Sequence, residues 1–474
     1  MVNSSPKHTP IRWTDGPILD DIALLRTLPN RQCYLFKRIQ LELAGPGELE
    51  TLQQFLLHNA FPELEGLSVK YEGPVAVQLT LPSFPSLTQL VTRGLLIQSG
   101  APTVPRLRSI GCDAQLDQYR PTQPSQQELR ILLNACSGAS DVQLKHSFFP
   151  SPRFDRPYDH PVPFPNLRTL WVEDGWDYLP NALAHLAASP ASRVDIVAHT
   201  DVHDFDLDHK GFWLDILPPN RSTSLPMLSS TRAIRLSANL FEPYAVDVRV
   251  PLANGATLSG SSDPLSLDVL DAQSSWSITA TNCREHSEEL IPTTLSELPR
   301  LIDCSKLVVL EMHTVPYLSP DRSTNEWETL LATMIALERL EIGGNRALEL
   351  VLDAFVSTED ILPALRVLVL CLGILPDEER LDDLAGLFSS TCSALAERQN
   401  RLKLLQVRIP PRDVGRLAKC SCLMEDTTAR AGEFVQFASQ FFPAQVVRKF
   451  CKSCHDGHPS VFREYEDDCM MEED

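Results

Sequence analysis

The sequence is short of positive charge. Its 474 residues include 42 lysines and arginines against 62 aspartates and glutamates, so the formal net charge at pH 7 is −20. A surface of this sign repels the phosphates of DNA, RNA and anionic membranes. The charge balance therefore argues against a nucleic-acid or membrane partner bound through the overall field of the protein.

Long apolar runs are also missing. The longest stretch of apolar residues and glycine, Val367–Leu375, is about half of what spans a bilayer. The first 16 residues contain Lys7 and Arg12 but no apolar segment typical of a secretory signal. We therefore expect a cytoplasmic or nuclear protein in which most of the 12 cysteines stay reduced.

The familiar catalytic motifs are absent from the sequence. It has no Gly-x4-Gly-Lys-Ser/Thr phosphate-binding loop, no Gly-x-Gly-x-x-Gly after a strand, and no Gly-x-Ser-x-Gly nucleophile motif. Since no constellation of residues argues for catalysis, we predict a non-enzymatic protein that needs no cofactor.

A short phrase recurs along the chain. It has the pattern apolar-x-x-Leu-x-apolar, often with an aromatic-Pro or Leu-Pro pair just ahead of the leucine. The copies are Phe61–Val69, Phe84–Leu90, Val104–Ile110, Phe164–Val172, Leu307–Met312, Leu337–Ile342, Leu365–Leu370 and Leu402–Val407. The last two apolar positions are two residues apart, so each phrase predicts a short strand with one apolar face.

Segments with helical spacing of apolar residues lie between these phrases. Ser125–Glu128 and Ser323–Glu326 are capping boxes that precede apolar stripes, and further stripes lie within 348–355 and 381–395. Strands and helices that alternate many times are typical of a right-handed parallel solenoid.

We therefore predict an α/β fold: an irregular leucine-rich-repeat solenoid with one curved parallel sheet and helices on its convex face. The strands expected side by side in this sheet contain Leu90, Leu170, Leu310, Leu340, Leu368 and Leu405. A doubly wound α/β domain is the alternative, but such a domain rarely repeats one phrase before strand after strand.

The predicted solenoid covers residues 31–410 and follows an N-terminal segment over 1–30. Within it, the stretch 210–299 contains Pro218-Pro219 and a serine-rich run, so we expect irregular repeats with long loops there. A C-terminal helical cap is predicted over 411–462, and an acidic tail over 463–474.

The Phe-Pro-x-Leu-x-x-Leu phrases and the opening stretch Phe36–Leu43 resemble the leucine-rich-repeat region of fungal F-box proteins, over about residues 18–410. The resemblance implies substrate recognition for a cullin-RING (SCF-type) ubiquitin ligase. The F-box itself is not recognisable, because Leu28-Pro29 is not followed by the expected Glu-Leu, and 1–30 is interpreted as a remnant of the F-box linker. A ligase-independent scaffold or interaction protein is the alternative.

In a repeat fold, the strand residues between the buried leucines line the open face of the sheet. The residues predicted to bind a partner there are Lys70, Arg93, Asp113, Trp171, Glu173, Glu311, His313, Arg339, Glu341, Gln406 and Arg408. Trp171 is the expected anchor, since an aromatic side chain among charges is typical of a binding hot spot. The mixed charges favour a protein or peptide partner over a polyanion.

Two groups of residues have side chains that can bind a metal. Cys420, Cys422, Cys451 and Cys454 form two close pairs that suit tetrahedral zinc, although the first pair is spaced more tightly than usual. The alternative is a capping helix whose cysteines are only packed or exposed. His199, His203 and His209 lie among aspartates. Histidines and carboxylates together can bind a transition metal, and the alternative is an ordinary loop or edge strand with solvated charges.

Overall fold

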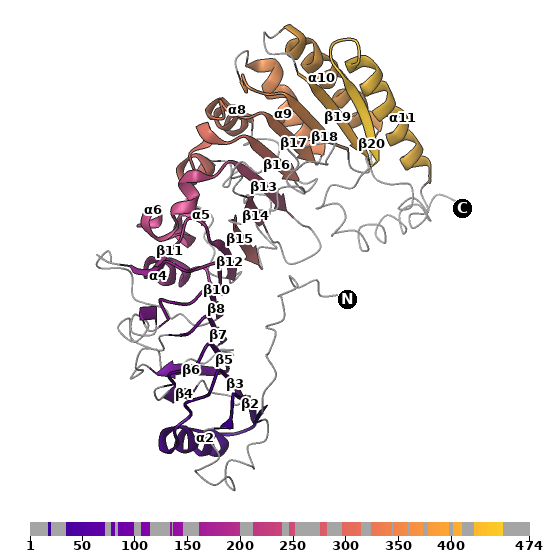
Figure 1. The fold of residues 1–474 in the computed structure, drawn as a ribbon. Helices are drawn as coiled ribbons and strands as arrows, with labels where there is room; N and C mark the ends of the chain where they lie inside the picture. The colour runs from indigo at the N-terminus through magenta and orange to yellow at the C-terminus, as the bar shows by residue number, and fades with distance from the viewer. Residues whose placement is uncertain are drawn as a thin grey trace. The chain divides into compact units, whose positions relative to one another are not determined.

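The computed structural model describes residues 18–19, 35–71, 77–80, 84–98, 106–113, 133–134, 136–145, 161–199, 212–238, 246–251, 275–281, 296–313, 324–343, 345–358, 361–372, 378–397, 402–409 and 421–448 (Figure 1). The chain divides into two compact units. The first consists of Met1–Phe149 and Val162–Leu167, and the second of Pro150–Pro161 and Arg168–Asp474.

The main sheet of the first unit is parallel throughout its described pairs. Its strands lie in the order β1 (Ile18–Leu19), β2 (Arg38–Leu43), β3 (Gly66–Tyr71), β5 (Gln89–Arg93), β7 (Ser109–Asp113) and β8 (Asp141–Lys145). Helix α2 (Pro46–His58) connects β2 to β3, and β4 (Val77–Thr80) pairs in parallel with β6 (Leu95–Gln98). The unit also contains β9 (Val162–Phe164).

The strands of the first unit have one buried face. In β7, Ile110 and Cys112 are buried, whereas the alternating Ser109, Gly111 and Asp113 are half-buried. The register aligns the buried residues of successive strands in one row, which contains Ile39, Leu67, Leu90, Ile110 and Val142. The alternation predicted from the phrases therefore produces a continuous apolar row across the sheet.

The Phe-Pro-x-Leu phrase forms a tight turn just ahead of a strand. The amide of Leu64 donates to the carbonyl of Phe61 at 3.3 Å, and Leu87 and Leu167 donate in the same way to Phe84 and Phe164. Proline suits the second position of such a turn because its φ is already close to −65°. The phenylalanines and leucines are buried at the two ends of each turn.

A backbone hydrogen-bond pattern repeats from strand to strand. The carbonyl of Glu65 accepts the amides of both Thr88, at 2.8 Å, and Gln89, at 3.0 Å. The same double acceptance occurs at the carbonyls of Lys37, Thr88, Arg108, Arg232, Val308, Glu338 and Arg366. Each of these residues stands just before a strand or at its start, so the pattern fixes the register of the next strand.

The second unit has a longer sheet. Its strands lie in the order β10 (Thr169–Gly175), β12 (Arg193–His199), β15 (Ser275–Thr281), β14 (Val246–Pro251), β13 (Ala233–Ala238), β16 (Val309–His313), β17 (Arg339–Gly343), β18 (Val367–Cys371), β19 (Leu404–Ile409) and β20 (Ala444–Arg448). The described helices of this unit include α4 (Leu179–Ala184), α5 (Phe212–Ile216), α6 (Arg221–Ser224), η2 (Pro226–Ser230), η4 (Cys304–Lys306), α8 (Thr324–Thr333), α9 (Asn345–Ser357), α10 (Glu378–Glu397) and α11 (Ser421–Ala438), and β11 spans Leu186–Ala188.

Strand β14 corrects the expectation of an entirely parallel sheet. It pairs antiparallel with both β13 and β15, and these three strands stand in the sheet in the reverse of their chain order. Between β13 and β14 the chain has only residues 239–245, and a parallel crossover needs roughly a dozen residues or more. The connection is therefore long enough only for an antiparallel return, and the stretch 210–299 contributes three strands to the sheet.

Strands β16 to β20 are parallel and are covered on one face by helices. Leu310, Leu340, Leu368 and Leu405 align in one buried row, as expected for neighbouring strands. Helices α9, α10 and α11 follow one another along this part of the sheet (Figure 1). Phe388 of α10 stacks on Phe434 of α11, with ring centroids 4.6 Å apart. The α/β class with parallel strands and helices is confirmed.

Among the described helices, none combines the length and the apolar character needed to cross a membrane.

The leucine row generates a stability prediction. Leu340 is completely buried, so Leu340→Ala should lower the free energy of unfolding by roughly 2–5 kcal/mol through lost packing and a cavity. Val356→Ala is the control, because this side chain on α9 is 43% exposed and should change stability by less than about 0.5 kcal/mol. Urea denaturation followed by circular dichroism measures both, and equal effects would contradict the register.

A second prediction concerns Gly94, between β5 and β6. Its φ is +68°, and a Cβ there would lie 2.1 Å from the carbonyl oxygen of Tyr71. Gly94→Ala should therefore cost more than about 1 kcal/mol. Gly47→Ala in α2 has open space around its Cβ and should be neutral or stabilising by up to about 1 kcal/mol. Thermal denaturation distinguishes the two variants, and a Gly94 variant as stable as the parent protein would refute the strained geometry.

Candidate functional site

Two of the predicted partner-binding residues meet in the first unit. Arg93 of β5 stands opposite Asp113 of β7 in the register, and their Nε and Oδ2 atoms are 3.8 Å apart. On the neighbouring strands, Lys70 Nζ lies 3.6 Å from Glu42 Oε1. These residues share the sheet face opposite the leucine row, so the C-terminal ends of the strands carry charges of both signs on that face, with two basic residues, Lys70 and Arg93, between the two acidic ones.

Trp171 and Glu173 stand on the same face of β10 in the second unit. The indole Nε1 of Trp171 donates a hydrogen bond of 3.0 Å to Glu173 Oε2. The other carboxylate oxygen, Oε1, lies 3.3 Å from Nε2 of His199 on β12. Trp171 is half-buried, and Glu173 holds its indole ring in one orientation. An aromatic surface that is already oriented loses little conformational entropy when a partner packs on it.

The sequence makes His199 a candidate metal ligand. In the structure, its imidazole contacts the carboxylate of Glu173. The register of β10 and β12 places His199 opposite Gly175, next to the row that contains Glu173. The residues are 26 positions apart, so only the strand pairing brings them together. Apolar and polar residues alternate along Arg193–His199, and this alternation in the sequence predicts that His199 lies on the open face of the sheet with Arg193 and Asp195.

The surface around Trp171 also contains an ion pair. Arg193 Nε lies 2.8 Å from Asp195 Oδ2, and Asp195 stands directly opposite Trp171 in the register. The side chain of Arg193 is 54% exposed and that of Asp195 is 16% exposed. We call Trp171, Glu173, Arg193, Asp195 and His199 the tryptophan patch. It combines apolar area with charges of both signs, which suits contact with a protein surface.

The structure contradicts the exposure expected for five other residues. Glu311, Arg339, Glu341, Gln406 and Arg408 were predicted to face solvent, but all five are buried, with 0–7% of their surfaces exposed. Strands β17 to β19 are buried on both faces. These side chains are therefore internal, and they do not form a solvent-accessible binding surface.

A signal for this burial was present in the sequence. Val309, Val369 and Cys371 occupy positions on the same sheet face as the five charged and polar residues, and they are also buried. Apolar residues at consecutive strand positions are typical of strands covered on both faces. The regular leucine spacing concealed this feature, because it describes only one face of each strand.

The buried residues form a charge network centred on Glu341. Its Oε2 accepts a hydrogen bond of 2.7 Å from Arg339 Nη2, and its Oε1 accepts one from Arg408 Nη1. Arg408 Nε also donates to Gln406 Oε1 at 3.2 Å, and Glu311 Oε1 lies 4.0 Å from Arg339 Nε. Two arginines and two glutamates balance one another, which offsets part of the cost of removing their charges from water.

The remaining predicted residues lie wholly or partly outside the described part of the chain. His313 ends β16, and only its backbone is described; the same holds for Cys422 in α11. Cys420, Cys451, Cys454, His203 and His209 lie outside the described residues. Where the structure is described, no three histidine, cysteine or acidic side chains come together as metal ligands would. The zinc hypothesis thus stays a prediction.

Several described cysteines are buried and protonated. Burial raises the pKa of the Cys112 and Cys304 thiols to about 11 and that of Cys392 to about 12. Burial also raises the pKa of Cys136. Since the thiolate is the nucleophile and the metal-binding form, these thiols act as apolar core residues at neutral pH.

Comparison of the sequence with protein-family models and with curated proteins finds no match.

The charge network generates a matched pair of substitutions. Glu341→Gln should lower the free energy of unfolding by about 3–5 kcal/mol, because it removes the carboxylate that two buried arginines share. Glu338→Gln removes the partner of Arg366 at an exposed pair and should cost less than about 1 kcal/mol. Chemical denaturation measures both; if the two variants were equally stable, the network would not be internal.

Proposed function

We propose that this protein is a leucine-rich-repeat solenoid that binds a protein partner through the tryptophan patch. The repeated double acceptance of amides by one carbonyl, together with the Phe-Pro-x-Leu turns, supports the repeat architecture. Turns of the same kind precede successive parallel strands, as expected when one structural unit is stacked many times.

The orientation of Trp171 by Glu173 is the observation that carries the proposed binding function. Aromatic side chains that pack into a partner contribute most to affinity when their conformation is set in advance. Arg193 and Asp195 would surround such a contact with charges that select the partner and its orientation. The proposed function requires no catalytic group and no cofactor.

The partner is proposed from the family resemblance. A substrate receptor of a cullin-RING ubiquitin ligase would hold its substrate on the sheet face and reach the ligase through an F-box and its adaptor. The alternative is an interaction protein that uses the same face without a ligase. Affinity purification of the full chain followed by mass spectrometry separates them: recovery of a cullin adaptor favours the receptor, and partners without any adaptor favour the scaffold.

Trp171→Ala tests the binding site itself. It should weaken binding to the co-purifying protein by about 2 kcal/mol or more, because the apolar anchor is removed. Trp171→Phe keeps the ring and should lose less. Leu57→Ala is the control, since this exposed residue lies on α2 in the other unit and should leave affinity unchanged. Calorimetric titration measures all three, and a folded Trp171→Ala variant with parental affinity would disprove the proposed site.

A further inference from the structure

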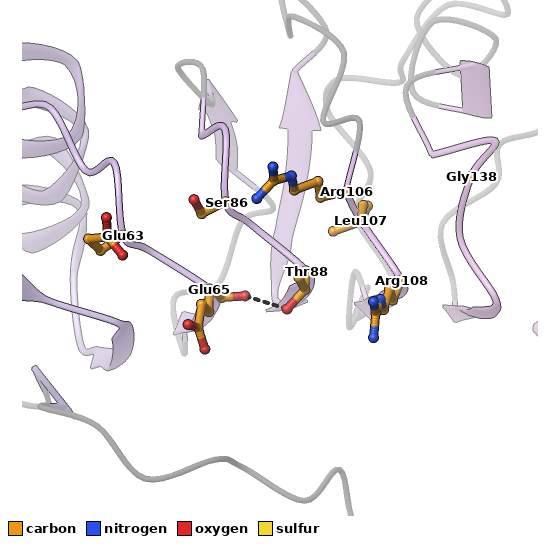
Figure 2. A pocket seen from close by; sticks show the side chains of 8 residues that line it. All are labelled: Glu63, Glu65, Ser86, Thr88, Arg106, Leu107, Arg108 and Gly138. Carbon is orange, nitrogen blue, oxygen red and sulfur yellow. Dashed lines mark hydrogen bonds between the residues drawn. The ribbon is translucent and has the colours of Figure 1, made fainter.

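A hollow of about 590 Å³ lies in the first unit, at the edge where the strands begin. Its lining comes from consecutive turns and includes Glu63, Glu65, Ser86, Thr88, Arg106, Leu107, Arg108 and Gly138 (Figure 2). Three of these residues, Glu63, Ser86 and Arg106, each stand three positions before the first residue of β3, β5 or β7. The first residues of these three strands are paired with one another in the sheet, so the turns ahead of the strands also lie side by side in a row.

The same chemical order occurs twice across the hollow. One row runs from Glu63 through Ser86 to Arg106, and the row next to it runs from Glu65 through Thr88 to Arg108. Both rows therefore have an acid, a hydroxyl and a base on successive turns. The short hydroxyl side chains between long charged ones account for the depression, and Figure 2 shows Arg106 extending from the basic wall toward Ser86.

The charges at the two ends of the hollow are not neutralised by each other. Glu65 pairs with Lys37 outside the hollow, with Nζ and Oε1 3.6 Å apart. In the described part of the chain, the side chains of Glu63, Arg106 and Arg108 make no hydrogen bond or ion pair, and all three are exposed. The hollow thus presents the Glu63 carboxylate on one turn and two guanidinium groups that start two turns further on, and that of Arg106 reaches toward Ser86 (Figure 2).

The spacing of the strands sets the distance between the backbone positions from which the Glu63 and Arg106 side chains start. Neighbouring strands are about 4.8 Å apart, so equivalent positions two repeats apart are separated by about 9.6 Å. In a polyproline II peptide, residues i and i+3 point in the same direction and are about 9.3 Å apart. In an extended strand, residues three apart point to opposite sides, so this conformation does not match the hollow.

We infer that the hollow binds a peptide segment in the polyproline II conformation that has a basic and an acidic residue three positions apart. The basic side chain pairs with Glu63, the acidic side chain pairs with Arg106 and Arg108, and the residues between them lie over Ser86 and Thr88. This site is in the first unit and is independent of the tryptophan patch.

Two isomeric peptides test the inferred geometry. Acetyl-Gly-Pro-Lys-Pro-Pro-Glu-Pro-Gly-amide has its charges three positions apart, and acetyl-Gly-Pro-Lys-Pro-Glu-Pro-Pro-Gly-amide has the same composition with the charges two positions apart. Fluorescence polarisation of the labelled peptides with the full chain, at low ionic strength, should show at least a fivefold preference for the first. Equal binding of the two isomers, or binding of neither, would overturn the inference.

Charge reversal provides a second measurement. Arg106→Glu should reduce binding of the first peptide at least fivefold, whereas Arg300→Glu, an equal change of charge at an exposed site in the second unit, should not. Glu63→Arg should shift the preference toward acetyl-Gly-Pro-Glu-Pro-Pro-Glu-Pro-Gly-amide. If Arg106→Glu and Arg300→Glu had the same effect, the hollow would not be the site. Trp171→Ala should leave this binding unchanged, so failure here is distinct from failure of the proposed function.

Discussion

One backbone carbonyl just before each of several strands accepts two amides at the start of the next strand in the sheet, and the register of these parallel strands in both units depends on this contact. At Glu65, the accepted amides belong to the residue before β5 and to the first residue of β5. The strand can then pair in only one register, since a shift by one residue would turn its leucine away from the core. The Phe-Pro-x-Leu turn ends just before the two donating amides and orients them toward the accepting carbonyl.

When the register is fixed, side chains at equivalent positions of neighbouring strands line up in rows. One row is apolar and fills the core, as with Leu310, Leu340 and Leu368. Other rows are free to vary, because nothing in the backbone contact depends on their side chains. The acid-hydroxyl-base rows of the first unit and the tryptophan patch of the second both depend on parallel strands that pair in a fixed register. They differ in place as well as in chemistry, because the rows lie in the turns ahead of the strands and the tryptophan patch lies on the strands themselves.

The strands around Glu341 show what happens when a second face is also buried. Charged side chains there must be neutralised within the protein, and Arg339 and Arg408 share the carboxylate of Glu341. Such a network is costly to break, because each remaining charge would have no access to water. It therefore specifies how β17 and β19 are placed around β18, in addition to the packing of the leucines.

The sequence by itself determined the local part of this protein: the turns, the short strands, their leucine face and the α/β class. These features follow from spacings of two to four residues, which steric and hydrogen-bonding rules convert directly into backbone structure. Only the tertiary structure decided the rest. The meeting of His199 with Glu173 and the burial of Arg339 both depend on pairing or covering by residues distant in the sequence. Whether a strand's second face meets water is a property of what packs against it, and the repeat spacing does not contain that information.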